Sequence, residues 1–255
     1  MTALRLADAG EAADLAAFLA RLIHYDRRAA VRIQAGGGVL AVFGQPAAFE
    51  VLAVRTARLA AEPDGPQDAT VSAGRLADAL DAAAGDTGCP AEGDVADPGP
   101  GLAVEVPESV TGPAWAGLLP PRGGWQRLDG IPGTTALRSA VAAAVSEFRE
   151  RTENVPEERR TRAELDVIGR DIWSRTLGGS ELPLRAVHAA HALGFLRPVR
   201  QEAPAGRSGG GAAVLEDDAP PVLLASGPWL RLRTPYGSVA VRRPGSGSGL
   251  TVSPV

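Results

Sequence analysis

Lysine is absent from this 255-residue chain, and all 26 of its basic residues are arginine. Arginine has GC-rich codons and lysine AT-rich ones, so the bias indicates a bacterial gene of high GC content. The absence excludes chemistry that uses a lysine Schiff base. It also excludes a phosphate-binding loop of the GxxxxGK[ST] type, which needs a lysine beside the phosphates.

Cysteine, aromatic residues and long apolar runs are also scarce. The single cysteine, Cys89, cannot form an intrachain disulfide, which favours a reducing compartment. Residues 4–23 are predicted to be amphipathic rather than a signal peptide, because Asp8, Glu11 and Asp14 interrupt the apolar positions. No run reaches the length of a membrane span. We therefore expect a cytoplasmic protein without a membrane partner, whose core is built from Ala, Val and Leu.

Signatures of catalysis and metal binding are missing as well. The sequence contains neither a GxSxG nucleophile motif nor an HExxH zinc motif. His188 and His191 lie three residues apart, but His24 is the only other histidine, and a zinc site needs three or four ligands. We predict no catalytic residue, no cofactor and no metal site, so an enzyme is less expected than a protein without catalytic activity.

Charge is divided unevenly along the chain. Residues 1–130 carry a net charge of −7, whereas residues 131–255 carry +3. An acidic surface repels nucleic acid, so only the second half is predicted to be compatible with a nucleic-acid partner.

The first half has the pattern of an α+β domain over residues 1–110, made of helices and antiparallel strands. Apolar residues at helical spacing predict helices over 11–25 and 72–84. The β-rich runs between them enclose a hairpin turn at 36–38, and 102–106 form one more strand. This order of elements is similar to one repeat of a DNA sliding clamp, whereas the acidic charge is opposite to that of a surface that encircles DNA.

Residues 111–133 form a connector rich in proline and glycine. Its two tryptophans, Trp115 and Trp125, lie among the prolines. They either pin the connector to one of the two domains or form a corner that binds a peptide or ligand, and the sequence leaves both interpretations open.

The second half is predicted to begin with three helices. They cover residues 134–155, 161–177 and 182–193, and Gly194 is typical of the left-handed residue that ends a helix. Residues 229–242 then form a two-stranded ribbon around a tight turn. One set of its side chains alternates toward a core: Leu230, Leu232, Val239 and Val241. The other set points away from it: Trp229, Arg231, Arg233 and Arg242.

Three helices followed by a ribbon resemble the winged-helix family of DNA-binding domains, over residues 134–243, with 244–255 as a flexible tail. In that family the third helix enters the major groove and the ribbon contacts phosphates. The resemblance implies groove contacts from Arg185, His188 and Ala192. It also implies phosphate contacts from the ribbon arginines: Arg231, Arg233, Arg242 and Arg243.

These patterns lead to three hypotheses. The first is a DNA-associated or regulatory protein that binds duplex DNA through residues 134–243. The alternative is a protein–protein adaptor in which the apolar third helix and Trp229 face another chain. A small-molecule enzyme is the third, and a deep pocket with converging polar groups would favour it. Oligomeric state does not follow from the sequence.

Overall fold

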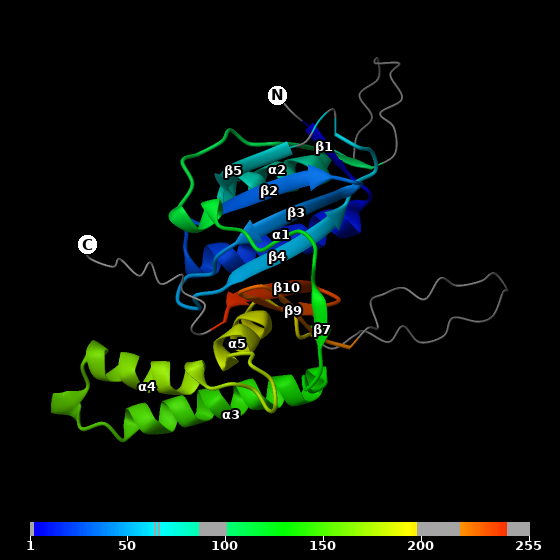
Figure 1. Cartoon of the computed structure of the whole chain (residues 1–255). Coiled ribbons are helices and arrows are strands. Elements are labelled where there is room, and N and C mark those ends of the chain that lie inside the picture. The colour runs from blue at the N-terminus through cyan, green and yellow to red at the C-terminus, as the bar shows by residue number, and fades with distance from the viewer. Residues whose placement is uncertain (1–2, 64, 66, 87–100, 198–219, 244–255) are drawn as a thin grey trace, which may run out of the picture.

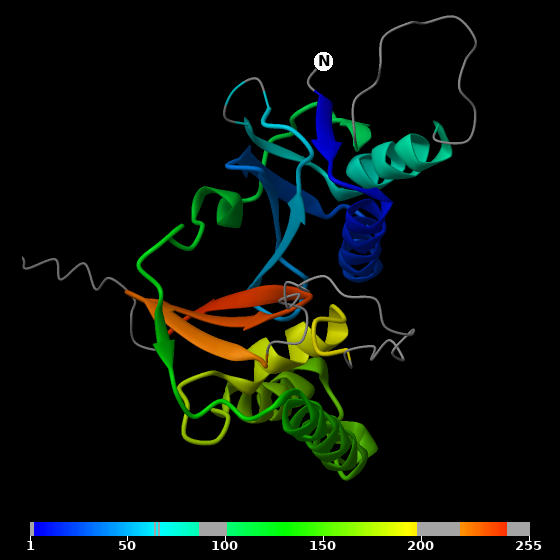
Figure 2. The same ribbon diagram turned by 90° about the vertical axis from the view of Figure 1, so that its right-hand side faces the viewer.

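The computed structural model describes residues 3–63, 65, 67–86, 101–197 and 220–243. Its central feature is an eight-stranded sheet with the strand order β5-β2-β3-β4-β10-β9-β8-β7. Every pair of neighbouring strands is antiparallel. Helices cover one face of this sheet, which we call the inner face, and the opposite face is the outer face (Figures 1 and 2).

The first half supplies four of the eight strands. Its elements are β1 (Ala3–Leu6), α1 (Ala9–Tyr25), β2 (Ala30–Gly36), β3 (Val39–Gly44), β4 (Leu52–Arg58), β5 (Gln67–Ser72), α2 (Ala73–Asp86) and β6 (Leu102–Glu105). Gly37 and Gly38 have φ values of +64° and +72°, which suits a two-residue hairpin turn that only glycine adopts freely. The predicted mixed α+β pattern and hairpin are confirmed. β1 and β6 pair in a separate two-stranded sheet.

The second half supplies the other four strands and three helices. Its elements are β7 (Gln126–Leu128), α3 (Thr134–Glu153), α4 (Arg162–Ser174), α5 (Leu184–Ala192), β8 (Val222–Ser226), β9 (Trp229–Thr234) and β10 (Gly237–Arg242). Thr161 caps α4 by accepting a hydrogen bond from the Glu164 amide, and Gly194 follows α5 with φ +75°. The three predicted helices and the ribbon are therefore present.

The two halves join where β4 pairs with β10, and we call this junction the seam. Only three residue pairs form it: Ser238–Val54, Val239–Ala53 and Ala240–Leu52. Because β4 and β10 are hydrogen-bonded neighbours, one sheet runs through both halves of the chain.

A single hydrophobic core lies on the inner face and also spans both halves. α1 contributes Leu15, Leu19 and Leu22, and α5 contributes Val187 and Ala190, all of them buried. Leucine, valine and alanine make up most of this core, as the low aromatic content predicted. The helices are therefore fixed to the sheet by burial of their apolar faces.

The loop between β3 and β4 fastens the halves at one further point. Ala48 and Glu50 have φ values of +74° and +52°, a conformation that costs energy for residues other than glycine. Phe49, between them, is buried, and its ring lies 5.2 Å from that of Tyr25 on α1 and 5.0 Å from that of His188 on α5. The strained loop thus places an aromatic side chain of the first half against a helix of the second.

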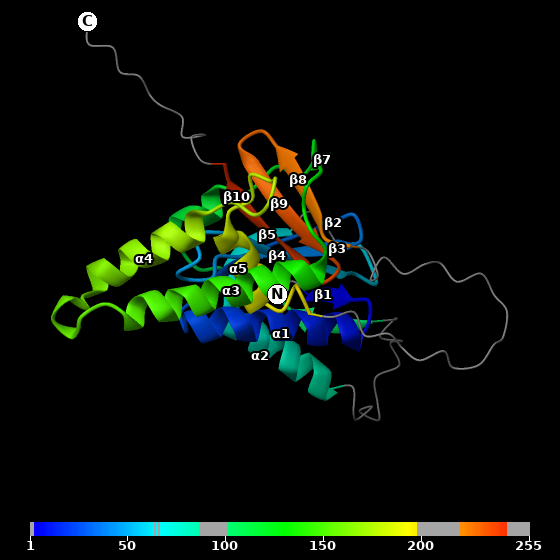
Figure 3. The same cartoon turned by 90° about the horizontal axis from the view of Figure 1, so that it is seen from below.

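α3 and α4 lie side by side and extend beyond the sheet as a helical arm (Figures 1 and 3). Arg151 and Arg175 each pair with both Glu147 and Asp171, at N–O distances between 2.5 and 3.3 Å. Hydrogen bonds from these guanidinium groups lower the pKa of both carboxyl groups. None of the described helices, including the 20-residue α3, is long and apolar enough to cross a membrane.

The winged-helix expectation is not confirmed. α5 packs against β10 with most of its side chains buried, so its apolar face is directed into the core rather than toward a groove. The ribbon of β9 and β10 lies between β4 and β8 inside the sheet, whereas the wing of a winged helix is an edge hairpin. The three helices and the ribbon were predicted in the correct order, but β8 was not predicted, and long-range strand pairing gives these elements a different arrangement.

Candidate functional site

The strands β7 to β10 carry an unusual charge pattern. They contain four arginines and no acidic residue: Arg127, Arg231, Arg233 and Arg242. Because arginine is charged at every physiological pH, these strands form a purely cationic part of a protein whose formal net charge is −4.

Strand register places all four arginines on the outer face. Arg127, Arg231 and Ala240 lie in one row across the sheet, because Arg127 and Arg231 both pair with Leu224 and Arg231 pairs with Ala240. Arg233 lies two residues after Arg231 on β9, and Arg242 lies two residues after Ala240 on β10. Both therefore point to the same face as Arg231. The intervening residues of β9 and β10 are buried in the inner core: Leu230, Leu232, Val239 and Val241. The predicted alternation of the ribbon is confirmed.

A second, smaller apolar cluster covers part of the outer face. Its buried members come from both halves of the chain: Phe43, Leu52, Val54, Trp229 and Ala240. The connector crosses this face (Figure 2). Its side chains Trp115, Leu119 and Trp125 pack on the cluster. The connector tryptophans therefore pack against a surface that the two halves build together, rather than against either half alone.

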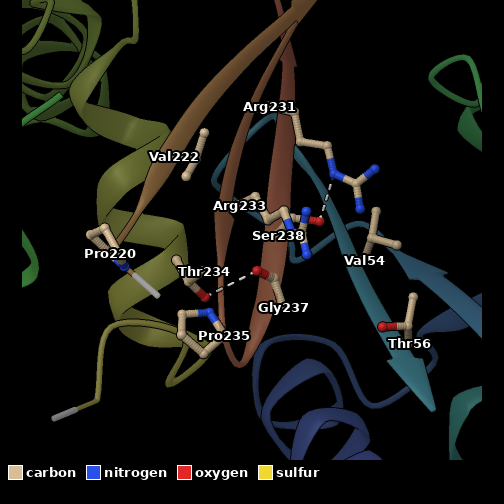
Figure 4. Close-up of a pocket in the computed structure, with 10 residues that line it drawn as sticks. All are labelled: Val54, Thr56, Pro220, Val222, Arg231, Arg233, Thr234, Pro235, Gly237 and Ser238. Carbon is tan, nitrogen blue, oxygen red and sulfur yellow. Dashed lines mark hydrogen bonds between the residues drawn. The ribbon is translucent and has the colours of Figure 1, made fainter. Parts of the chain in front are cut away.

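A pocket of about 320 Å³ opens on the outer face beside the seam (Figure 4). β4 continues to Arg58, but its pairing with β10 ends at Val54 because β10 begins only at Gly237. The unpaired end of β4 and the turn before β10 leave space for the pocket. Polar atoms of Thr56, Arg231, Arg233, Thr234 and Ser238 line it. The rest of its wall is Val54, Pro220, Val222, Pro235 and Gly237, so among the described residues no carboxylate, histidine or thiol lines the pocket.

Arg231 is the half-buried cation of this pocket. Its Nε donates a hydrogen bond of 2.8 Å to the Ser238 hydroxyl, and its guanidinium carbon lies 5.7 Å from the centre of the Trp125 ring. Burial, and then the positive charge of Arg233, lower the pKa of Arg231. No ion pair joins Arg231 to any carboxylate of the described residues, and within them its neighbours are the Ser238 hydroxyl and the Trp125 ring.

Apart from Arg231 and Arg233, the side chains predicted to contact a nucleic acid or a partner lie away from the pocket. Arg242 is exposed and stacks over Trp229 at 5.6 Å, and Trp229 itself is only 9% exposed. Arg243 pairs with Glu181 at 3.2 Å. Trp229 is therefore packed within its own chain, with little surface to offer another protein.

Arg185 and His188, on α5, lie at the packing interface of that helix. His188 stacks on Trp173 with ring centres 4.3 Å apart, and the Phe49 ring packs against it edge-on at 5.0 Å. Burial, and then His191, lower the pKa of His188. The Nε atom of Arg185 is buried and has no hydrogen-bond partner among the described residues. The structure brings neither side chain to the outer face, so the two helix residues and the ribbon arginines do not form one site.

Two further features bear on metal and thiol chemistry. Within the described ranges, no group of three or more His, Cys, Asp or Glu side chains is placed to hold a metal ion. Cys89 lies outside the described residues.

The sequence did not point to Ser238, Thr56 or Val54 as parts of a site. Each is an ordinary strand residue, and only the pairing of β4 with β10 brings them beside Arg231. That pairing joins positions more than 180 residues apart, and no local pattern signals it.

Both halves match families whose function is not known. Residues 1–117 match a domain of unknown function (DUF8010), and residues 120–246 match another (DUF8185). No curated protein matches the chain.

Among solved structures, the chain is similar to two crystal structures of the DNA polymerase sliding clamp from Pseudomonas aeruginosa, one of them with a ligand. Sequence identity is 12% and 11%, and the TM-scores are 0.44 and 0.45. Each match covers 95% of this chain and 64% of the clamp chain, so this chain spans less than two thirds of the clamp's length. Both TM-scores are below 0.5, so the likeness is a loose one.

Proposed function

We propose that this is a DNA-associated protein that contacts phosphates through the outer face of β7 to β10. The observation that carries the proposal is the alignment of four arginines on one face of four strands that contain no acid. Guanidinium groups on a sheet face suit phosphate oxygens, which accept paired hydrogen bonds from arginine.

Contacts of this kind position a protein on the nucleic-acid backbone without reading bases. The outer face offers no Asn or Gln on β8, β9 or β10 with which to recognise base edges. We therefore expect weak sequence preference and strong dependence on salt. The acidic first half would orient the protein, because it repels the backbone while the arginine face attracts it.

The pocket favours binding over catalysis. The small-molecule enzyme considered from the sequence would need a general base at such a site, and the described side chains that line the pocket offer only arginines, hydroxyls and apolar groups. These groups hold an anion but neither supply nor accept a proton at neutral pH.

The test is binding of the full chain to duplex DNA in 50 and 200 mM NaCl. Four phosphate contacts predict an affinity about 100-fold lower at the higher salt concentration. Changing any one of the four arginines to glutamine is expected to reduce the salt slope by about one.

Arg162→Gln is the matched control, because Arg162 lies at the start of α4 on the helical arm and its side chain is 96% exposed. DNA binding that is absent at 50 mM NaCl would contradict the proposal. A loss of affinity in Arg162→Gln equal to that in the outer-face variants would also contradict it.

A further inference from the structure

In the pocket beside the seam, Arg231 is a cation that has no counter-charge among the described residues. Arg231 is half-buried on β9, and among the described residues its only side-chain hydrogen-bond partner is the Ser238 hydroxyl, which engages Nε. Within those residues, the two terminal nitrogens of the guanidinium group form no hydrogen bond. Removing a cation from water is costly unless an anion or several acceptors replace the lost hydration.

Arg55 is the other half-buried arginine beside the seam, and its charge is paired within the chain. Arg55 on β4 has an 11% exposed side chain and points to the inner face. Its Nη2 lies 2.6 Å from Asp14, and its Nη1 donates a 2.6 Å hydrogen bond to the Tyr236 carbonyl. Arg55 is thus neutralised by Asp14, whereas Arg231, on the opposite face of the same junction, has no carboxylate partner among the described residues.

The hydroxyl groups around Arg231 complete a set of donors. Ser238 accepts from Arg231, so its own O–H remains available to donate to a ligand. Thr56 lines the opposite wall from β4 and is exposed. Thr234 is already engaged, because it donates to the Gly237 carbonyl and accepts from the Tyr236 amide.

We propose that this pocket is an oxyanion site that receives one phosphoryl group, held by the Arg231 guanidinium with the hydroxyls of Ser238 and Thr56. Arg233 lines the same pocket and adds a second positive charge. The volume of about 320 Å³ exceeds that of a phosphate ion, so it also accommodates part of the group to which the phosphate is attached.

The inference rests on the proposed function in one respect, namely that the phosphoryl group can be a backbone phosphate of DNA. The same chemistry also suits a free phosphate monoester. The two sources differ in their competition behaviour, because a backbone phosphate needs the other outer-face arginines as well, whereas a free phosphate needs the pocket alone.

The probe is inorganic phosphate. Its binding is measured as the change in Tm of the full chain, compared with sodium chloride of equal ionic strength. We expect 10 mM phosphate to raise Tm by about 3 °C if its Kd is near 1 mM. Arg231→Gln should abolish this rise. Arg127→Gln should leave it intact, since Arg127 lies in the same cross-strand row but outside the pocket.

Thr56→Val provides a second variant that does not disturb the fold, because Thr56 is exposed. It should reduce the phosphate-dependent rise in Tm while leaving the Tm in chloride unchanged. The proposal is overturned if phosphate raises Tm no more than chloride does, or if Arg127→Gln removes the effect as fully as Arg231→Gln.

Binding of the same variants to duplex DNA distinguishes a backbone phosphate from a free phosphate monoester. It also tests the DNA role separately from the phosphate pocket. If the phosphoryl group comes from DNA, Arg231→Gln should weaken DNA binding by about tenfold, and Arg127→Gln by only about two- to threefold. Millimolar phosphate should then compete with DNA for the pocket. A phosphate-dependent rise in Tm without DNA binding would support the pocket and refute the DNA role. Salt-sensitive DNA binding, with equal losses in the two variants and no phosphate effect, would support the DNA role and refute the pocket.

Discussion

The two faces of the seam hold half-buried arginines in opposite circumstances. On the inner face, Asp14 lies between Arg55 and Arg197, at 2.6 and 3.1 Å, and Arg197 also stacks over Tyr236 at 3.9 Å. On the outer face, Arg231 has a hydroxyl and an aromatic ring for neighbours. Removing the partner of a matched arginine leaves a half-buried charge uncompensated, whereas an arginine with no matching carboxylate among the described residues is available to a ligand.

The largest effect on stability is expected from removing the carboxylate of the inner face. Asp14→Asn leaves Arg55 half-buried without its counter-charge, so we expect the free energy of unfolding to fall by about 2 kcal/mol. The loss is smaller than for a fully buried pair because the Asp14 side chain is 37% exposed. Urea denaturation measures it. A change within error of zero would show that the inner cluster contributes nothing to joining the halves.

On the outer face, removing the charge of Arg231 is not expected to lower the free energy of unfolding. Arg231→Met keeps an apolar stem of similar length and removes an unmatched charge, while losing the hydrogen bond to Ser238. We expect the free energy of unfolding without phosphate to be unchanged or to rise by up to about 1 kcal/mol. The same urea titration measures it, and destabilisation as large as that of Asp14→Asn would mean that Arg231 is as structural as Arg55.

Stability is also expected to depend on pH through His188, which is half-buried under the inner face. Burial gives His188 a lowered pKa, so the unfolded chain binds a proton more readily than the folded one below the ordinary value of 6.5. Stability should therefore hold at neutral pH and decline as the pH falls through 6. His188→Gln should flatten this decline, whereas His24→Gln, at an exposed position of α1, should not. Equal slopes for the two variants would exclude His188 as the source.

The smallest effect is expected on the helical arm, where matched charges are exposed. Glu147→Gln removes one carboxylate from the network with Arg151 and Arg175. Exposed pairs are weakened by solvent and salt, so Tm should fall by about 1 °C or less, and the difference should vanish in 0.5 M NaCl. A larger, salt-independent fall would show that the network fixes the position of α4.

Local structure was predictable from the sequence where a local cause exists. Apolar spacing located α1, Gly37 and Gly38 marked a hairpin, and the alternation in β9 and β10 identified which arginines share a face. That alternation is also the part of the candidate site that could be predicted, because strand geometry alone sends successive side chains to opposite faces.

Features that depend on long-range pairing were not predictable. β1 and β7 are short, and nothing in their sequences reveals the partner strand that stabilises each of them. The pairing of β10 with β4 turned an expected wing into interior strands and brought Thr56 to the pocket. The winged-helix interpretation relied on the order of elements, and the same order is compatible with more than one pairing.

The three residue pairs of the seam also govern when the sheet can form during synthesis. β4 is translated more than 170 residues before β10, so until β10 emerges its edge has no partner there. An unpaired strand edge invites association with other chains. Arg55 and Arg58 on β4 place charge along that edge, which makes premature pairing with another nascent chain less favourable.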